Sequence, residues 1–388
     1  YRDNGDFGIL NSLTSSHAST LMKGTGKEGE DTMTVGGDLV VDVRNLNTRT
    51  IINDGAHLTA GGKLSATSAA TGTQVTFAGQ LPVYLALTRP NYVSTKKARS
   101  GFGGSVIVGE KTFNTVTYIG AATLAAGQLD VDATGDAFMM EMSLAGTFGS
   151  EDHGVQGGVN IIVENKMTVS EVSGDAQITL KNQGEVEGSS ITATDKSVLL
   201  NISGMEADGG KTAVGVGVAV TVNNAFTAAM LGNNLPINST YESNWKSVWG
   251  DSVMPFARAG AITLNLDTYS NLTVEAENRA AAINIGLSAA VQTGGSGDAS
   301  VAANVGVAYS KTETTARQFG VTATGHSDNN DITTQSADTS TIVSVAGDAS
   351  INTSGKNKVT GAGALSVNRG VMDTTAYVTN CDYGNIGD

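Results

Sequence analysis

Apolar and polar side chains alternate in short stretches along most of this chain. Every second residue is apolar in residues 128–133 (QLDVDA), and the same pattern is found in residues 271–276 (NLTVEA) and 348–352 (DASIN). A period of two is typical of a β-strand with one buried face. No stretch shows a sustained helical period, so the sequence predicts an all-β protein.

A longer pattern recurs from one end of the chain to the other. Residues 36–41 (GGDLVV) and 47–52 (NTRTII) align without a gap with residues 103–108 (GGSVIV) and 114–119 (NTVTYI), at an offset of 67. Successive copies can be aligned on one threonine, with sequence offsets of 67, 51, 59, 88 and 60, at Thr50, Thr117, Thr168, Thr227, Thr315 and Thr375. Repetition on this scale predicts stacked structural units.

Together the two patterns predict a right-handed parallel β-helix (solenoid) with inserted surface loops. We expect coils of about 20 residues that stack about 4.8 Å apart, so that one repeat makes about three coils. The chain would then form about 19 coils and a rod about 90 Å long. We also expect the asparagine beside the anchor threonine to form a ladder at a turn. The alternative is an array of β-sandwich domains, one for each repeat.

Two segments interrupt the repeat, and we interpret both as loops inserted into a surface of the solenoid. Residues 79–100 contain two of the four prolines and a basic cluster, and residues 233–260 contain both tryptophans and the other two prolines. Removing the second segment reduces the offset of 88 to 60. The chain lacks an initiator methionine and ends within a repeat, so we interpret residues 1–388 as a single β-helical repeat segment of a larger exported protein.

The composition limits the kind of partner. With 15% charged residues and a net charge of −14, the chain lacks the clustered Lys and Arg that nucleic acid requires. The acidity indicates a soluble exposed surface. The longest apolar run, residues 213–222, is too short to cross a bilayer as a helix, so we expect a segment that does not span the membrane. A single cysteine, Cys381, excludes an internal disulfide.

The repeat phrase resembles that of the leukotoxin-type filamentous adhesins and, more broadly, the passengers of type V secretion systems. Its elements here are a Gly/Ala/Val stretch, Asn-x-x-Thr, a turn, and an alternating phrase such as residues 124–133 (LAAGQLDVDA). The resemblance covers nearly all of residues 30–388. It implies an exported β-helical stalk of the autotransporter kind, located on the bacterial outer surface or secreted, that contributes to cell adhesion and virulence. The export route stays open.

The sequence predicts no catalytic residue, no metal site and no cofactor. The four histidines, His17, His57, His153 and His326, lie far apart and show no metal-ligand spacing. Two polar clusters, residues 151–153 and 328–331, are interpreted as turns, although the second could supply oxygen ligands. Residues 294–298 resemble one calcium-binding repeat, but Ala299 stands where the repeat requires Asp, and the phrase occurs once. Cys381 is interpreted as a small packed side chain.

The best candidate for a binding element is the second insertion. It gathers Tyr241, Trp245, Trp249 and Phe256 in a chain with only 5% aromatic residues. Exposed Trp and Tyr are common anchors of interfaces and stack on sugar rings. The alternative is that the insertion folds back and packs these rings in a small core of its own. The basic cluster at residues 96–99 could contact acidic glycans.

We therefore expect a structural and adhesive stalk segment rather than an enzyme. Its expected partners are a host or bacterial surface protein or glycan, together with homo-association into filaments. A carbohydrate-active β-helix enzyme, such as a polysaccharide lyase or glycosidase, is the main alternative and would require carboxylates aligned in a groove. A segment of a cytotoxin is the second alternative.

Overall fold

The computed structural model describes residues 10–16, 19–23, 32–79, 100–150, 152–181, 188–232, 260–267, 269–292, 299–326, 330–353 and 359–386. Nearly all of these residues lie in β-strands, and no helix occurs among them. This confirms the all-β prediction. The strands form three sheets, here called A, B and C, whose strands pair in parallel except for the β2–β3 pair.

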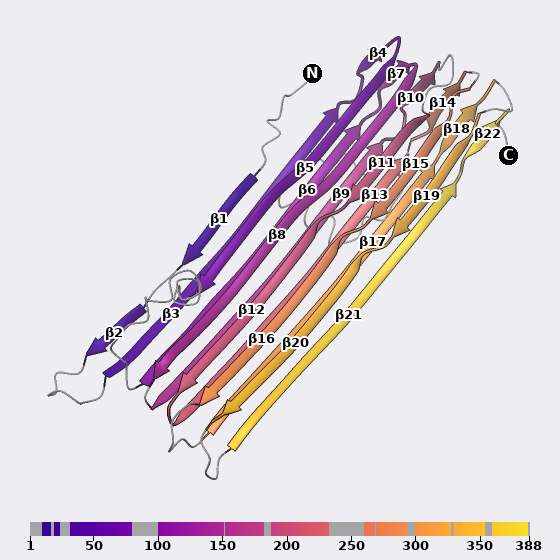
Figure 1. The fold of residues 1–388 in the computed structure, drawn as a ribbon. Helices are drawn as coiled ribbons and strands as arrows, with labels where there is room; N and C mark the ends of the chain where they lie inside the picture. The colour runs from indigo at the N-terminus through magenta and orange to yellow at the C-terminus, as the bar shows by residue number, and fades with distance from the viewer. Residues whose placement is uncertain are drawn as a thin grey trace.

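Sheet B consists of the longest strands, in the order β2 (Ser19–Lys23), β3 (Thr32–Ile52), β6 (Ser100–Ile119), β9 (His153–Val172), β13 (Thr212–Leu231), β17 (Ala299–Phe319) and β21 (Val359–Thr379). Sheet C consists of short strands: β4 (His57–Thr59), β7 (Thr123–Ala126), β10 (Gln177–Leu180), β14 (Ile262–Leu266), β18 (Val321–Thr324) and β22 (Asp382–Gly384). Figure 1 shows the long strands side by side, with the short strands gathered at one end of the molecule.

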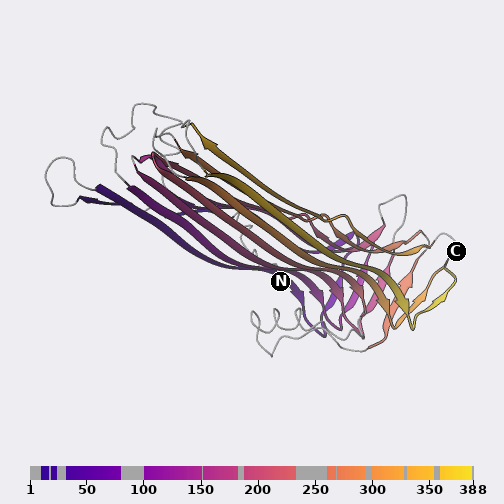
Figure 2. The same ribbon diagram turned by 90° about the horizontal axis from the view of Figure 1, so that it is seen from below.

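Sheet A begins with β1 (Leu10–Ser16), β5 (Lys63–Gly79) and β8 (Gln128–Ser150). Beyond β8 each strand is divided into two, giving β11 (Ser189–Asp195) with β12 (Val198–Gly209), β15 (Leu272–Asn278) with β16 (Ala281–Gln292), and β19 (Ile332–Asp338) with β20 (Thr341–Asn352). Sheets A and B pack face to face, and Figure 2 shows them as long twisted layers.

The chain passes through the sheets in a fixed order: B, then C, then A, and back to B. One such circuit is called a coil here. Each coil adds one strand to sheet B beside the strand of the previous coil, as β13 does beside β9 from Thr212 and His153 to Leu231 and Val172 without a break in register. Each repeat thus shares every sheet with its neighbours. The alternative of one separate sandwich domain for each repeat is therefore wrong.

The expected coil size is also wrong. Register partners in neighbouring coils lie one whole repeat apart in the sequence, which is 60 residues for Asn278 and Asp338, so one repeat makes one coil rather than three. β8 alone has 23 residues, which corresponds to about 75 Å of extended chain, whereas the six strands β3, β6, β9, β13, β17 and β21 stack over only about 24 Å. The longest dimension therefore follows the strands and not the stacking direction.

The threonine alignment is correct in three of its five steps. Thr50 pairs with Thr117, Thr168 with Thr227, and Thr315 with Thr375. The other two steps are wrong, because the partner of Thr117 is Ser170 and the partner of Thr227 is Thr314. A slip of one residue, as at Thr315, places a side chain on the opposite face of a strand.

The asparagine ladder forms in pairs, but at mid-strand rather than at a turn. Asn114 donates its side-chain N–H to Oδ1 of Asn47 at 2.9 Å, and Asn224 donates in the same way to Asn165 at 3.0 Å. Each pair lies on neighbouring long strands of sheet B. The Asn-x-x-Thr phrase therefore marks the interior of a strand.

The strands of sheet A break at one common level. Asp195, Asn278 and Asp338 are register partners there, beside Gly135 of the unbroken β8. The side-chain oxygen of each accepts a hydrogen bond of 2.9–3.0 Å from the backbone N–H two residues later, which is an Asx turn. This level divides the molecule into a proximal half, beside sheet C, and a distal half.

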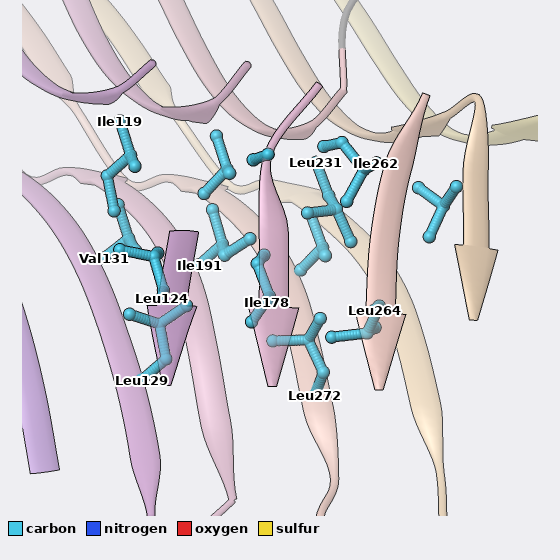
Figure 3. Close-up of a cluster of buried hydrophobic side chains, with 14 of the residues drawn as sticks. Ile119, Leu124, Leu129, Val131, Ile178, Ile191, Leu231, Ile262, Leu264 and Leu272 are labelled. Atoms are coloured by element: carbon cyan, nitrogen blue, oxygen red, sulfur yellow. The ribbon is translucent and has the colours of Figure 1, made fainter. Parts of the chain in front are cut away.

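The main apolar core lies in the proximal half, between the three sheets. Figure 3 shows side chains from all three sheets meeting there. Its fully buried members include Ile119 and Leu231 from sheet B, Leu124 from sheet C, and Val131 and Ile191 from sheet A. Leu129, Val131 and Ala133 are at most 1% exposed, which confirms the predicted alternation in residues 128–133.

The two predicted insertions fall between sheets. Residues 79–100 connect β5 of sheet A to β6 of sheet B, and residues 233–260 connect β13 of sheet B to β14 of sheet C. Apart from their end residues Gly79, Ser100 and Gly260, both insertions lie outside the described residues.

Candidate functional site

The predicted aromatic binding element, Tyr241, Trp245, Trp249 and Phe256, lies outside the described residues. Its position in the chain places it between the end of β13 and the start of β14. The basic cluster at residues 96–99 also lies outside them. Both binding hypotheses therefore stay predictions.

Several polar residues singled out in the sequence have structural partners. Asp152 pairs with Lys211 at 2.8 Å. Asn330 is buried and donates to the carbonyl oxygens of Asp267 and Ser270 at 2.8 and 2.9 Å, so it holds a turn. Sγ of Cys381 contacts the carbonyl oxygen of Thr379, and this side chain packs against the main core. The structure describes only part of residues 151–153 and 328–331, and none of residues 294–298.

A line of buried charges crosses the interior near the level of the sheet A break. Lys111 Nζ lies 2.5 Å from Oδ2 of Asp42 and 3.0 Å from Oε1 of Glu141. Lys166 Nζ lies 3.4 Å from Oε2 of Glu164 and 3.5 Å from Oδ2 of Asp195. The two clusters are adjacent, because Lys111 and Glu164 are register partners on β6 and β9.

Local sequence makes room for these charges. A side chain at Gly109 would place its Cβ 3.0 Å from Oε1 of Glu141, so glycine leaves the space that this carboxylate occupies. Thr76 donates a hydrogen bond of 2.6 Å to Oδ2 of Asp42, and Arg44 contributes an N–H to Oδ1 at 2.9 Å. Asp42 is thus held by groups from both long sheets.

The pKa values reflect an excess of acid in this interior. Burial raises the pKa of Glu141, and the attraction of Lys111 does not offset it. Burial likewise raises the pKa of Glu164 against the attraction of Lys166, and the neighbouring Asp195 adds to the effect. Burial also acts to raise the pKa of Asp42, but the hydrogen bonds from Lys111, Thr76 and Arg44 outweigh it and leave that pKa lowered.

This arrangement supports the fold rather than chemistry on a substrate. All four carboxylates are at most 5% exposed, and each lies beside a lysine in the interior. The carbohydrate-active alternative requires carboxylates aligned in a groove that a glycan can enter. Within the described ranges, no three His, Cys, Asp or Glu residues lie close enough to hold a metal ion.

The second feature of the described residues is that the polar and apolar positions change sides along the strands. In the proximal half, sheet A has apolar side chains inside and polar ones outside. Val131 and Ile191 are register partners facing the core, whereas Asp132 and Thr192 face outward and hydrogen-bond to each other at 2.7 Å. This is the ordinary pattern of a half-buried strand.

In the distal half the interior is mixed, because buried polar side chains lie between small apolar clusters such as Val40, Ala78 and Ile107. Glu141, Asn201 and Asn284 are inward-facing register partners on β8, β12 and β16. Asn201 donates to the hydroxyl of Thr221 at 2.9 Å and Asn284 donates to the carbonyl oxygen of Ala219 at 3.0 Å, so side chains of sheet A bond across to sheet B. Buried amides and hydroxyls are tolerated where they find such partners.

The two sheets also lie close together in the distal half. A Cβ added at Gly215 of sheet B would stand 2.8 Å from the carbonyl oxygen of Ala289 in sheet A. The same addition at Gly286 would meet Oδ1 of Asn304 at 2.1 Å. Glycine at these two inward positions is therefore required by the narrow spacing.

The outward positions of the distal half are apolar on both sheets. On sheet B, Val214, Val216, Val218, Val220 and Val222 of β13 all face outward, and the same positions of β9 and β17 are aliphatic, glycine or tyrosine. On sheet A, Met140, Leu200, Ile283 and Val343 form one outward column, and Met142, Ile202, Ile285 and Val345 form another. Val216 is 42% exposed and Leu287 is 50% exposed.

Sequence reasoning missed this exchange although the pattern was visible. Residues 348–352 were grouped with residues 128–133 as half-buried strands, and this is wrong for their polarity. Ser350 faces inward and donates to Oγ of Ser300 at 2.8 Å, whereas Ile351 is 51% exposed. The true counterpart of residues 128–133 in that coil lies in β19. A signal for the exchange is present in the sequence: where the polar residues of an alternating strand are small or carry amides, they can face the interior and leave the apolar residues outside.

Comparisons with known proteins identify no relative. No protein-family model matches the chain, and neither the curated proteins nor the solved structures contain a significant match. Within the described ranges, no helix is long and apolar enough to cross a lipid bilayer.

Proposed function

We propose that the chain is a structural and adhesive stalk segment of a filamentous protein that is exported to the bacterial surface or secreted. The proposal includes a path of the right-handed parallel β-helix type, with coils of about 60 residues. The resemblance of the repeat phrase to leukotoxin-type adhesins favours export by a type V pathway, one of the routes left open by the sequence.

The observation that carries this proposal is the uninterrupted parallel register between coils. Twenty-one consecutive residues of β17 pair with β21, and twenty of β13 pair with β17. Because neighbouring coils are joined by backbone hydrogen bonds along such lengths, the stack resists bending and shear. That property suits a spacer that holds a binding element away from a cell.

The alternative of a carbohydrate-active enzyme receives no support from the described carboxylates. The largest group of them, Asp42, Glu141, Glu164 and Asp195, lies inside the stack and beside lysines. The adhesive element of the proposal is the aromatic insertion with Tyr241, Trp245, Trp249 and Phe256, and its partner would be a surface protein or glycan.

Two measurements test the proposal. Antibodies raised against the purified chain should label intact cells of the producing organism, and beads coated with the chain should adhere to host or bacterial cells. Replacing the four aromatic residues of the insertion with alanine should reduce adhesion at least about tenfold, since each such anchor contributes about 1–2 kcal/mol. Labelling that appears only after the cells are permeabilised, or cleavage of glycans by the purified chain, would refute the proposal.

A further inference from the structure

The distal half of sheet B presents a continuous outward surface built from six strands. We define the apolar face as the outward positions of residues 35–43, 102–110, 155–163, 214–222, 301–309 and 361–369. Their side chains form columns across the coils, since register partners repeat the same residue type. One such column contains Leu39, Val106, Val159, Val218, Val305 and Leu365, and the next contains Val41, Val108, Ile161, Val220, Val307 and Val367.

This surface is exposed to solvent and almost free of charge. Leu39 and Val41 are each 64% exposed at one edge, and Leu365 is 55% exposed at the other. The charged members, Glu110 and Arg369, both fall in the column at the margin nearest the proximal half. Monomeric proteins rarely expose a contiguous apolar patch of more than a few hundred Å², so a patch of this kind marks an interaction site.

The apolar face has a groove along part of its width. A column of small residues, Gly37, Gly104 and Gly157, separates two columns of larger aliphatic and aromatic side chains. A Cβ added at Gly157 would meet no atom within 4 Å, and the same holds at Gly363 of β21. The space above these glycines can therefore receive side chains from a facing sheet.

The outward surface of sheet A is also apolar, but it lacks the open groove and the freedom from charge. In its column of Leu144, Gly204, Leu287 and Gly347 each leucine covers the glycine beside it, with Leu144 Cδ2 at 2.7 Å from a Cβ added at Gly204. Two carboxylates, Glu206 and Asp208, also lie on outward positions of β12. Burial, together with the nearby Asp208, raises the pKa of Glu206. Sheet A is therefore the less suitable docking surface.

We propose that the apolar face of sheet B docks against the same face of a second copy of this chain. The proposal deepens the stalk function and rests on it for its biological purpose, which is lateral association of stalks. Two twisted sheets pack in this way about 10 Å apart, with columns of one sheet seated between columns of the other. A uniformly acidic chain can approach its own copy through this face, because the centre of the face has no charge to repel.

The size of the face fits a protein partner. Eight steps along a strand and five steps across the sheet give about 26 Å by about 24 Å, or roughly 600 Å² before the relief of the side chains is added. A stable interface covers about 800 Å² of accessible surface on each partner, so the two values are of the same order.

A lipid surface is the less favoured occupant. Glu110 and Arg369 lie in one column of the face. Charged side chains are costly in hydrocarbon, whereas they remain hydrated at the polar rim of a protein interface.

The test compares the purified full chain with four matched variants by analytical ultracentrifugation over a range of concentrations. We expect the unmodified chain to associate, and the Val159→Lys/Val218→Lys variant to have a dimer dissociation constant raised at least about a hundredfold. The isosteric Val159→Thr/Val218→Thr variant should show an intermediate loss. Thr273→Lys, on the polar outer face of the proximal half, and Ile283→Lys, on the outer face of sheet A, should associate as the unmodified chain does. Circular dichroism and the thermal midpoint verify that each variant is folded.

The proposal is overturned if the unmodified chain stays monomeric, if the double lysine variant associates normally, or if only Ile283→Lys abolishes association. It is also overturned if the chain floats with phosphatidylcholine vesicles and the double lysine variant does not, since lipid would then be the occupant. The outcome is separate from that of the proposed function. A monomeric chain on the cell surface would refute the docking alone, whereas an associating chain confined to the cell interior would refute the stalk function alone.

Discussion

At the scale of the residue, the most consequential groups are the buried charges near the level where sheet A breaks. Four carboxylates face two buried lysines, with Arg44 at the margin of Asp42. Burial would lower the pKa of Lys166, but Asp195 and Glu164 outweigh it and raise that pKa. The excess of acid falls on Glu141 and Glu164, whose raised pKa values follow from burial.

These shifts predict how stability varies with pH. The raised pKa of Glu164 contributes stability that is fully present below the unfolded value of 4.5 and is lost as the pH rises through the folded value. Replacing Glu164 by glutamine removes this contribution. As the pH rises from 4.5 to about 8, the free energy of unfolding of Glu164→Gln should therefore increase relative to that of the unmodified chain. Urea unfolding at each pH measures this difference.

Thr273→Ser is the control, because Thr273 lies on the outer face of β15, outside the buried cluster, and the substitution removes no titratable group. Its curve of stability against pH should run parallel to that of the unmodified chain. Parallel curves for Glu164→Gln as well would show that Glu164 titrates in the folded protein as it does in the unfolded one. The lowered pKa of Asp42 acts in the opposite sense, since its stabilisation is lost as the pH falls below 3.8.

At the scale of the element, the long strands combine two properties that a single strand seldom has. Their proximal parts bury the main apolar core, and their distal parts bury amides, hydroxyls and glycine beside smaller apolar clusters. β13 illustrates this, because Leu231 lies in the main core while Thr221 and Asn223 lie in the polar interior. The two sheets approach so closely in the distal half that some inward positions, such as Gly215, have no space for a Cβ.

A pair of glycine substitutions tests this spacing. Gly215→Ala would bring its Cβ to 2.8 Å from a backbone oxygen of sheet A. The backbone of a paired strand cannot move away to relieve this contact, whereas a long side chain could change its rotamer. We expect a loss of about 1–3 kcal/mol in the free energy of unfolding from overpacking. Gly157→Ala, with nothing within 4 Å of its Cβ, should be neutral or slightly stabilising. Equal effects of the two substitutions in chemical unfolding would contradict the close approach of the sheets.

At the scale of the whole molecule, the coil is the unit of construction. Thr273 pairs with Thr333, Ala281 with Thr341, Ala299 with Val359, and Thr322 with Asp382, so the offset in the sequence is the same in all three sheets. Among the described elements, the strands of each coil pack against those of the coils beside it, as expected for a repeat protein. A complete coil should therefore be removable without loss of the fold.

Deleting residues 273–332 joins Leu272 to Thr333 in register and removes one complete coil. The shortened chain should keep its β-sheet circular dichroism spectrum. Its calorimetric enthalpy of unfolding should fall by about 40 kcal/mol, at about 0.7 kcal/mol for each residue removed. Deletion of residues 273–331 is the control, because it shifts every following side chain to the opposite face and should prevent folding. Similar behaviour of the two deletions would show that register between coils does not govern the fold.

The sequence by itself determined the all-β class, the presence of a long repeat, and the alternation that places Leu129 and Val131 in a core. These features are local, since hydrophobic period and repeat length can be counted along the chain. The candidate binding element could also be named from composition alone, and it remains untested. The buried lysines and carboxylates were not predicted, because Asp42, Lys111 and Glu141 come together only when three strands distant in sequence are paired.

Only the tertiary structure decided the number of residues in a coil and which face of each strand is buried. A glycine or asparagine inside a strand resembles a turn signal in sequence, and so each single coil was divided into three. A period of two shows that neighbouring side chains point to opposite faces, but it does not show which face is covered. In the distal half the approach of the two sheets at Gly215 leaves no room for a Cβ, and the valines of β13 lie on the outward face.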